Sequence, residues 1–242
     1  MTPLTSEQTG AFPTPGEIIS YIEMCRAWDV SFQRGMYFHL KGDISVVLMS
    51  RRRDAPYRDQ IENEGRVLIY EGHDLPKVKG GPDPKATDQP RQNPGGTLTQ
   101  NGLFEKAALE FKRPGKLPEL VAVYEKIHRG IWAFNGSFRL TDCKLESDGT
   151  RKVFRFRLEL TDTEIDFNTR SKNELEHTRM IPSAVKLEVW KRDKGRCVLC
   201  GAKDNLHFDH EVPYSKGGSS LVSKNVRLLC ARHNLSKSDK IQ

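Results

Sequence analysis

Apolar and polar residues alternate along several segments in the first two thirds of the chain. Residues 153–160 are the clearest case, because apolar and charged side chains alternate at every position from Phe154 to Leu160. A period of two predicts a strand with one face in a core and the other in water. Shorter apolar runs bounded by glycine, aspartate or charged residues predict further strands at 32–40, 44–50, 66–70, 120–124 and 131–140.

Three other segments are expected to be helical. Thr14-Pro15-Gly16-Glu17 has the sequence of a capping box with proline at the first helical position, which predicts a helix from Thr14. Apolar residues at helical spacing predict a second helix at 99–112, and a third should begin at Ser183. Asn135-Gly136 is the strongest short signal for a hairpin turn.

The polar segments divide the chain. Residues 1–12 have the composition of a disordered leader, and residues 162–182 that of a linker between two domains. Residues 74–98 contain almost no apolar side chains and predict a long loop. The sequence therefore predicts an α+β protein with an N-terminal domain at 13–161 and a small C-terminal domain at 183–242, called the N-terminal and C-terminal regions below.

The C-terminal region contains two pairs of metal ligands at matching spacing. Cys197 and Cys200 form the first pair, and Cys230 and His233 the second. Two residues between ligands allow one turn to aim both side chains at a single ion, and three thiolates with one imidazole suit tetrahedral Zn²⁺. A region this small has too little core to fold without such a cross-link. We expect a structural zinc site, and a DNA-binding module without catalysis remains one interpretation.

Between and after these ligands, the chain resembles the HNH endonuclease family. The matching residues are Asp209-His210, Pro213, Gly217-Gly218, Asn225, Leu228-Leu229-Cys230, Asn234 and Lys237. The resemblance implies a β-hairpin and a helix around one metal ion, the ββα-metal fold. It also implies that His210 is the general base, that Asp209 and Asn234 hold the catalytic cation, and that Asn225 orients the imidazole of His210. A direct role for His207 stays open. His233 stands where many members have cysteine, and Asn234 where the family name expects histidine.

The chemistry of these residue types agrees with that implication. Carboxylate and amide oxygens are hard ligands that suit Mg²⁺ or Mn²⁺ and leave coordination positions for phosphate and water. An imidazole with a pKa near ~6.5 is a suitable base at neutral pH. His210 follows Asp209 directly, so in a regular strand the two side chains point to opposite faces.

Charge favours a nucleic-acid partner. The chain has 242 residues and a net charge of +7. From Ser183 onward there are 12 Lys or Arg against 6 Asp or Glu, which leaves 27 against 26 in the rest of the chain. The C-terminal region therefore carries most of the attraction to phosphate.

The apolar pattern and the cysteines bear on location. No apolar run reaches about 18 residues, so no membrane span is expected, and the first residues do not resemble a signal peptide. Cys25 and Cys143 fall outside the ligand pairs among apolar neighbours and are expected to be reduced thiols in the cytoplasm.

The N-terminal region resembles the SRA (SET and RING associated) domain. The segments that carry the resemblance are Ser45–Ser50, Ala55–Asp59, Ile69–Gly72, Asp88-Gln89, Thr99–Gly102, Gly130–Trp132 with Gly136, and the strand at Phe154–Leu160. The resemblance implies a twisted β-barrel with flanking helices that recognises modified cytosine by flipping it from the duplex. Tyr57 and Tyr70 would be the stacking rings and Asp59 the acceptor for the exocyclic amine, with Gln60 as the alternative to Asp59. Taken alone, Tyr57 is typical of an exposed loop and Tyr70 of a core strand.

Together the two resemblances predict a modification-dependent DNA endonuclease. Its partner would be double-stranded DNA carrying 5-methyl- or 5-hydroxymethylcytosine, and its cofactors structural Zn²⁺ and catalytic Mg²⁺ or Mn²⁺. One metal centre cuts one strand, so we expect a homodimer for double-strand breaks. Two alternatives remain: an HNH nuclease whose N-terminal region recognises an unmodified sequence or structure, and a catalytically silent protein that binds modified DNA.

Overall fold

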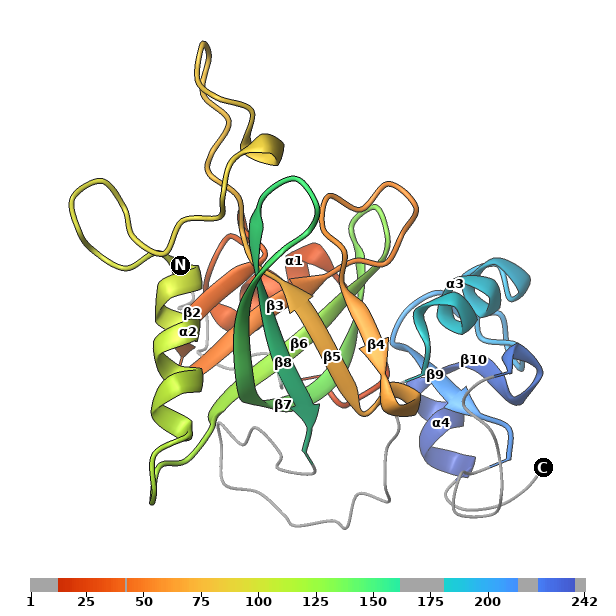
Figure 1. Ribbon diagram of the computed structural model, residues 1–242. Helices are drawn as coiled ribbons and strands as arrows, with labels where there is room; N and C mark the ends of the chain where they lie inside the picture. The colour runs from red at the N-terminus through yellow and green to blue at the C-terminus, as the bar shows by residue number, and fades with distance from the viewer. Residues whose placement is uncertain (1–12, 42, 162–180, 213–221, 238–242) are drawn as a thin grey trace, which may run out of the picture.

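A computed structural model describes residues 13–41, 43–161, 181–212 and 222–237 (Figure 1). The predicted leader, and the predicted linker apart from Ile181 and Pro182, lie outside these residues. The strands are β1 (Glu17–Ser20), β2 (Met36–Lys41), β3 (Ile44–Met49), β4 (Gln60–Glu62), β5 (Val67–Glu71), β6 (Glu119–His128), β7 (Ile131–Ser147), β8 (Lys152–Leu160), β9 (Leu206–His210) and β10 (Val226–Cys230). The helices are α1 (Tyr21–Trp28), α2 (Gln100–Phe111), α3 (Ser183–Arg192) and α4 (Ala231–Lys237), with short 3-10 helices η1 (Asn63–Gly65), η2 (Pro84–Ala86) and η4 (Ser223–Asn225).

The ten strands of the described residues belong to one sheet. Its main order is β10-β9-β1-β7-β6-β3-β2, and β8, β5 and β4 branch from β7. The long β7 makes this possible, because its first residues pair with β1 and its later residues with β8. The predicted α+β class and sheet-rich body are confirmed. In the described residues β2 and β4 do not pair with each other, so the sheet remains open.

The Asn135-Gly136 pair does not form a turn, so the hairpin prediction is wrong. β7 runs straight through both residues, and the register with β6 shifts from Val123↔Gly136 to Tyr124↔Phe134. Asn135 is therefore the extra residue of a β-bulge, and Gly136 next to it has a φ of 103°. The long pairing with β6 outweighs the local turn preference.

The helix predicted from Thr14 is also wrong in its start. Residues 17–20 form β1, and α1 begins only at Tyr21, capped by a reciprocal pair of bonds between Ser20 and Glu23. Thr14 and Glu17 do make the bonds of a capping box, since the Thr14 amide donates to the Glu17 carboxylate at 2.8 Å. The box closes a turn before β1, because β1 has strand partners on both of its edges.

Three apolar clusters fill the structure. Phe104 and Ala108 of α2 pack with the side chains of β3, β5, β6, β7 and β8 that face them. Met24 and Trp28 of α1 pack against the other face of the sheet. The third cluster joins α3, β9 and β10 to residues of β1, β6 and β7. No helix among the described residues is long and apolar enough to cross a membrane.

Candidate zinc and nuclease site

The β9–β10 hairpin is the scaffold of the C-terminal site. The two strands pair antiparallel from Leu206↔Cys230 to His210↔Val226. The turn after α3 joins the free edge of β10: the Asp193 carboxylate accepts a hydrogen bond from the Leu228 amide at 2.9 Å, and the Val198 amide donates to the Leu228 carbonyl at 2.9 Å. α4 packs on both strands. The segments that carry the four predicted zinc ligands are thereby fixed against one hairpin.

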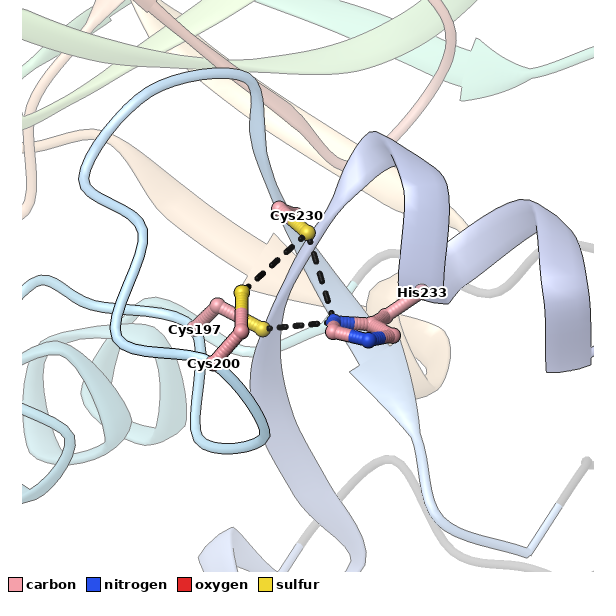
Figure 2. Close-up of side chains that lie close together, drawn as sticks. All are labelled: Cys197, Cys200, Cys230 and His233. Carbon is pink, nitrogen blue, oxygen red and sulfur yellow. Dashed lines mark hydrogen bonds between the residues drawn. The ribbon is translucent and has the colours of Figure 1, made fainter.

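The four predicted zinc ligands lie together (Figure 2). Cys197 and Cys200 come from the turn after α3, Cys230 from the last residue of β10 and His233 from α4. His233 Nδ1 lies 3.3 Å from Cys197 Sγ and 3.4 Å from Cys230 Sγ, and the Sγ atoms of Cys200 and Cys230 are 3.8 Å apart. All four ligand atoms lie within 4.8 Å of one another.

These separations fit a tetrahedral zinc ion. Bond lengths of about 2.3 Å to sulfur and about 2.1 Å to nitrogen place sulfur atoms about 3.8 Å apart, and sulfur and nitrogen about 3.6 Å apart. The Cys197 thiol is also prepared for metal binding: although desolvation acts to raise its pKa, hydrogen bonds from the Cys230 amide and with His233 lower the pKa to about 6. The donor set, spacing and protonation therefore suit structural Zn²⁺.

Two of the residues predicted to act in catalysis lie at one end of the same hairpin. Asp209 and His210 are the last residues of β9, and they pair across the hairpin with Arg227 and Val226. Both side chains are partly exposed. Asn234 lies on α4, the helix that packs on β9 and β10. The hairpin end thus presents a carboxylate and an imidazole at the surface.

Asn225 makes a paired contact with the backbone. Its Oδ1 accepts a hydrogen bond from the Val212 amide at 2.8 Å, and its Nδ2 donates to the Val212 carbonyl at 3.1 Å. The Asn225 carbonyl also accepts a hydrogen bond from the Glu211 amide at 2.7 Å. Asn225 therefore fixes the backbone of the two residues that follow His210.

Arg227 is a candidate that the sequence analysis missed. It lies opposite Asp209 in the hairpin, with its Nε 3.8 Å from Asp209 Oδ2 and its Nη1 3.9 Å from Glu211 Oε1. Its side chain is 12% exposed, yet Nε and Nη2 are buried without a hydrogen-bond partner. Buried guanidinium donors are seldom left unpaired. No spacing in the sequence marks this residue, because its position depends on the hairpin register.

His207 is buried in the middle of β9. It pairs with Leu229 on one side and with Glu17 of β1 on the other. Desolvation lowers the pKa of its imidazole, while Glu17 and Asp209 act in the opposite direction. A neutral, buried histidine between two strands fits a structural role better than direct contact with a substrate.

The predicted base-binding residues of the N-terminal region occupy different environments. Tyr57 is partly buried in the loop before β4 and stacks on His73, with ring centroids 5.8 Å apart and an interplanar angle of 14°. Lys85 Nζ lies 4.3 Å from the centroid of the Tyr57 ring. Desolvation raises the pKa of the Tyr57 hydroxyl.

Tyr70 lies in the core. It is 1% exposed, packs in the cluster that contains Phe104 and Phe156, and donates a hydrogen bond from its hydroxyl to the Gly35 carbonyl at 2.9 Å. Tyr70 is thus a core residue of a strand, which was the alternative to a stacking role. The structure does not bring its ring to the surface beside Tyr57. The aromatic ring stacked on Tyr57 is that of His73.

Asp59 anchors the loop that carries Tyr57. It is buried, and its two carboxylate oxygens accept hydrogen bonds from the amides of Ser50 and Glu71, each at 3.1 Å. Desolvation raises the pKa of this carboxyl to about 7. The alternative residue, Gln60, is exposed at the start of β4.

A buried charge network supports the same loops. The Arg151 side chain is 2% exposed and lies 2.6 Å from Asp74 and 3.5 Å from Glu71, while Arg155 contacts Glu71 at 3.1 Å. Arg151 also donates to the carbonyls of the loop around η2. The network ties that long polar loop, which the sequence predicted, to β8.

Comparisons with known proteins agree with the C-terminal assignment. Residues 197–240 match the family model described as HNH endonuclease, which confirms the predicted resemblance for this region. No curated protein sequence matches the chain.

Solved structures similar to the chain include SRA domains and a restriction endonuclease. SUVH5 SRA in complex with methylated CHH DNA is 18% identical with a TM-score of 0.43, over 64% of this chain and 93% of that chain. SUVH5 SRA bound to hydroxymethylated CG DNA is 17% identical with a TM-score of 0.41, over 62% and 90%. The Type IV phosphorothioation-dependent restriction endonuclease ScoMcrA is 16% identical with a TM-score of 0.42, over 94% of this chain and 59% of that chain. At these TM-scores the likeness is loose, so the role of the N-terminal region rests on its own residues.

Proposed function

We propose that this protein is a metal-dependent DNA endonuclease whose N-terminal region directs it to modified cytosine. The observation that carries the nuclease assignment is the hairpin end with Asp209 and His210, inside a segment that matches the HNH model and on the same hairpin as one of the clustered zinc ligands, Cys230. The excess of basic residues in the same region supports a polyanionic substrate.

In this proposal His210 takes a proton from the attacking water. Asn225 keeps the imidazole in place by fixing the following backbone at Val212. Asp209 and Asn234 have the hard oxygen ligands that would hold Mg²⁺ or Mn²⁺, and such an ion, when bound, stabilises the negative charge that develops on the phosphate. The zinc cluster would have a structural role only, because the protein supplies all four ligands of a tetrahedral ion and leaves no coordination position for a substrate.

Arg227 would bind the phosphate next to the cleaved bond. Its two unpaired donors and its place beside Asp209 suit a bidentate contact with phosphate oxygens. The same guanidinium would also form an ion pair with the Asp209 carboxylate. The phosphate contact and the contact with Asp209 both require the Arg227 guanidinium to stay close to the hairpin end. The pairing of Arg227 with Asp209 across the two strands keeps it there.

The N-terminal region would recognise the base with Tyr57. A flipped base loses stacking in the duplex and regains it on an aromatic ring, which is worth about 1–3 kcal/mol per base. Two observations support this role for Tyr57. The segments around it resemble those of SRA domains, and the hydrogen bonds of Asp59 to the Ser50 and Glu71 amides hold its loop in place. We propose no stacking role for Tyr70, whose ring is enclosed in the core.

A cleavage assay with matched plasmids tests the proposed function. Plasmids carrying cytosine, 5-methylcytosine or 5-hydroxymethylcytosine are incubated with the protein and Mg²⁺ or Mn²⁺. We expect cleavage of modified plasmid by the wild type, and binding without cleavage by His210→Ala. Equal cleavage of all plasmids would favour recognition of unmodified DNA, and binding without any cleavage would favour a silent binding protein.

Double-strand cleavage would use two copies of the chain, because one chain has one proposed catalytic centre. Sedimentation velocity in the presence of modified DNA tests the homodimer. A chain that stays monomeric while breaking both strands in one encounter would contradict it.

A further inference from the structure

The N-terminal and C-terminal regions are joined by backbone hydrogen bonds as well as by the covalent chain. β1 lies between β7 of the N-terminal region and β9 of the hairpin, with Ile18 opposite Ala133 on one edge and Leu206 on the other. Figure 1 shows the β9–β10 hairpin beside the larger sheet. Because β1 pairs with a strand of each region, the sheet fixes the position of β9 along β1 and therefore relative to β7.

Gly16 makes a bond to each side of this junction. Its amide donates to the Phe134 carbonyl at 2.7 Å, and its carbonyl accepts from the Phe208 amide at 3.1 Å. Its φ is 88°, and a Cβ at this position would lie 3.2 Å from the Phe208 carbonyl oxygen. A side chain at this point would be strained by the positive φ and would crowd the Phe208 carbonyl, so glycine is favoured where the strands meet.

A buried charge cluster makes a second connection. Lys186 of α3 is 2% exposed. Its Nζ donates to Glu125 Oε2 of β6 at 2.8 Å and to Asn135 Oδ1, in the bulge of β7, at 2.5 Å. Removing one partner of a buried pair leaves an uncompensated charge, so this contact tolerates little displacement of α3 from the sheet.

A shared apolar core makes the third connection. Ile18, Ile127 and Ala133 belong to the N-terminal region, and they pack in the same buried cluster as Val185, Leu206 and Phe208 of the C-terminal region. Domains that move independently are expected to meet through smaller and more polar surfaces. The three connections differ in kind but hold the same pair of regions.

We propose that this junction, rather than the segment between Thr161 and Ile181, sets the position of the nuclease hairpin relative to the recognised base. Lys186 and Gly16 are positioning residues, since they act through the hairpin and do not touch DNA. The inference rests on the proposed function, and it states that each strand is cut at one fixed distance from the mark. A nuclease on a flexible tether would instead cut at many distances.

The test maps cut sites on end-labelled duplexes that contain one 5-methylcytosine. One variant carries about five Gly and Ser residues inserted after Ser171, which adds roughly 12 Å of flexible reach, or about three to four base pairs. We expect the inserted chain to cut at the wild-type position. Cuts spread over several base pairs, in the wild type or in the inserted chain, would overturn the proposal.

Two substitutions test the junction directly. Gly16→Ala and Lys186→Met are expected to spread the cuts over several positions while zinc content stays at the wild-type level. Gly149→Ala is the matched control, because Gly149 has a similar φ of 98° but nothing within 4 Å of its added Cβ. It should leave both cut position and rate unchanged. Unaltered cut positions in both junction variants would contradict the proposal.

Amide hydrogen exchange on the full chain separates this inference from the proposed function. The Phe208 amide should exchange as slowly as the amides of β7, and faster in Gly16→Ala, whether or not the DNA is cut. An inactive wild type would count against the proposed function alone. Fast exchange of the Phe208 amide in the wild type would contradict the proposal that the junction holds the hairpin in place.

Discussion

Contacts between residues far apart in the sequence hold the N-terminal sheet together, whereas two short segments hold the C-terminal site. The Trp28 indole donates a hydrogen bond to the Tyr124 hydroxyl at 2.9 Å, although the two residues are 96 positions apart. Helix α2 packs on strands that precede it in the sequence and on strands that follow it. The zinc ligands come instead from Cys197-x-x-Cys200 and Cys230-x-x-His233. The comparison teaches that distributed apolar burial holds one region, whereas the other combines an apolar core with four clustered side chains that could hold a metal ion.

The largest expected effect comes from removing a zinc ligand. Cys200 is exposed, so Cys200→Ser loses little packing and its consequence reports on the metal. Structural zinc contributes about 10 kcal/mol or more to the folding of small zinc domains. We expect Cys200→Ser to lose zinc by elemental analysis and to lose amide protection in β10, with β6 and β8 still protected.

Cys25→Ser is the matched control for this prediction, because Cys25 lies on α1 outside the cluster. It should keep one zinc per chain. Full zinc occupancy or an unchanged melting temperature in Cys200→Ser would contradict the assignment of the cluster as a structural site.

The same contrast explains how much the sequence predicted. Ligand spacing predicted the four zinc residues, because two residues three positions apart on one turn are neighbours whatever surrounds them. The strand periodicity at 153–160 likewise predicted β8. These features are local, so the sequence contains the information directly.

What the sequence did not predict depends on distant partners. β1 forms because β7 and β9 are available on its two edges, and this overrides the helix signal at Thr14. Asn135-Gly136 forms a bulge because β6 continues past it. Tyr70 and Arg227 take their environments from the strands opposite them, Tyr70 in the core and Arg227 beside Asp209. None of these partners can be found by spacing.

A second prediction uses two buried groups of the N-terminal region that titrate in opposite senses. Desolvation raises the pKa of Asp59 to about 7, so the folded state binds a proton more readily and acidification below pH 7 stabilises it. Desolvation lowers the pKa of His73 to about 4, so acidification below about pH 6.5 protonates the unfolded state first and destabilises the fold. The two effects oppose each other between about pH 6.5 and 4.

Asp59→Asn should expose the contribution of His73. When the pH is lowered from 7 to 4, the unfolding free energy of Asp59→Asn, measured relative to wild type, should fall by up to about 3 kcal/mol. The unfolding free energy of His73→Gln, measured in the same way, should rise by a similar amount. Urea unfolding at three pH values measures both. Because the zinc site is common to all three proteins, its own pH dependence cancels in the comparison. Parallel pH curves for the three proteins would show that these groups are not desolvated as described.

A third prediction returns to the C-terminal hairpin. Arg227→Gln should slow cleavage by about 30-fold, or about 2 kcal/mol, because it removes a charge-assisted contact to phosphate. Binding to modified DNA should change much less. Lys203→Gln is the control, since it removes an exposed positive charge from the same region. Equal slowing in both variants would attribute the effect to general electrostatics instead of a specific contact.

The smallest effects distinguish the two tyrosines of the N-terminal region. Tyr57→Ala should reduce the preference for modified DNA by about 1–2 kcal/mol, measured by competition binding, with zinc content and melting temperature little changed. Tyr70→Phe should do the reverse: it removes the hydrogen bond to Gly35 and costs about 1 kcal/mol of stability, with no change in preference. The ring of Tyr70 remains in place, so only its hydroxyl is tested. Loss of preference in Tyr70→Phe would mean that the core of the sheet takes part in recognition, and the distinction between a loop that binds and a core that supports would fail.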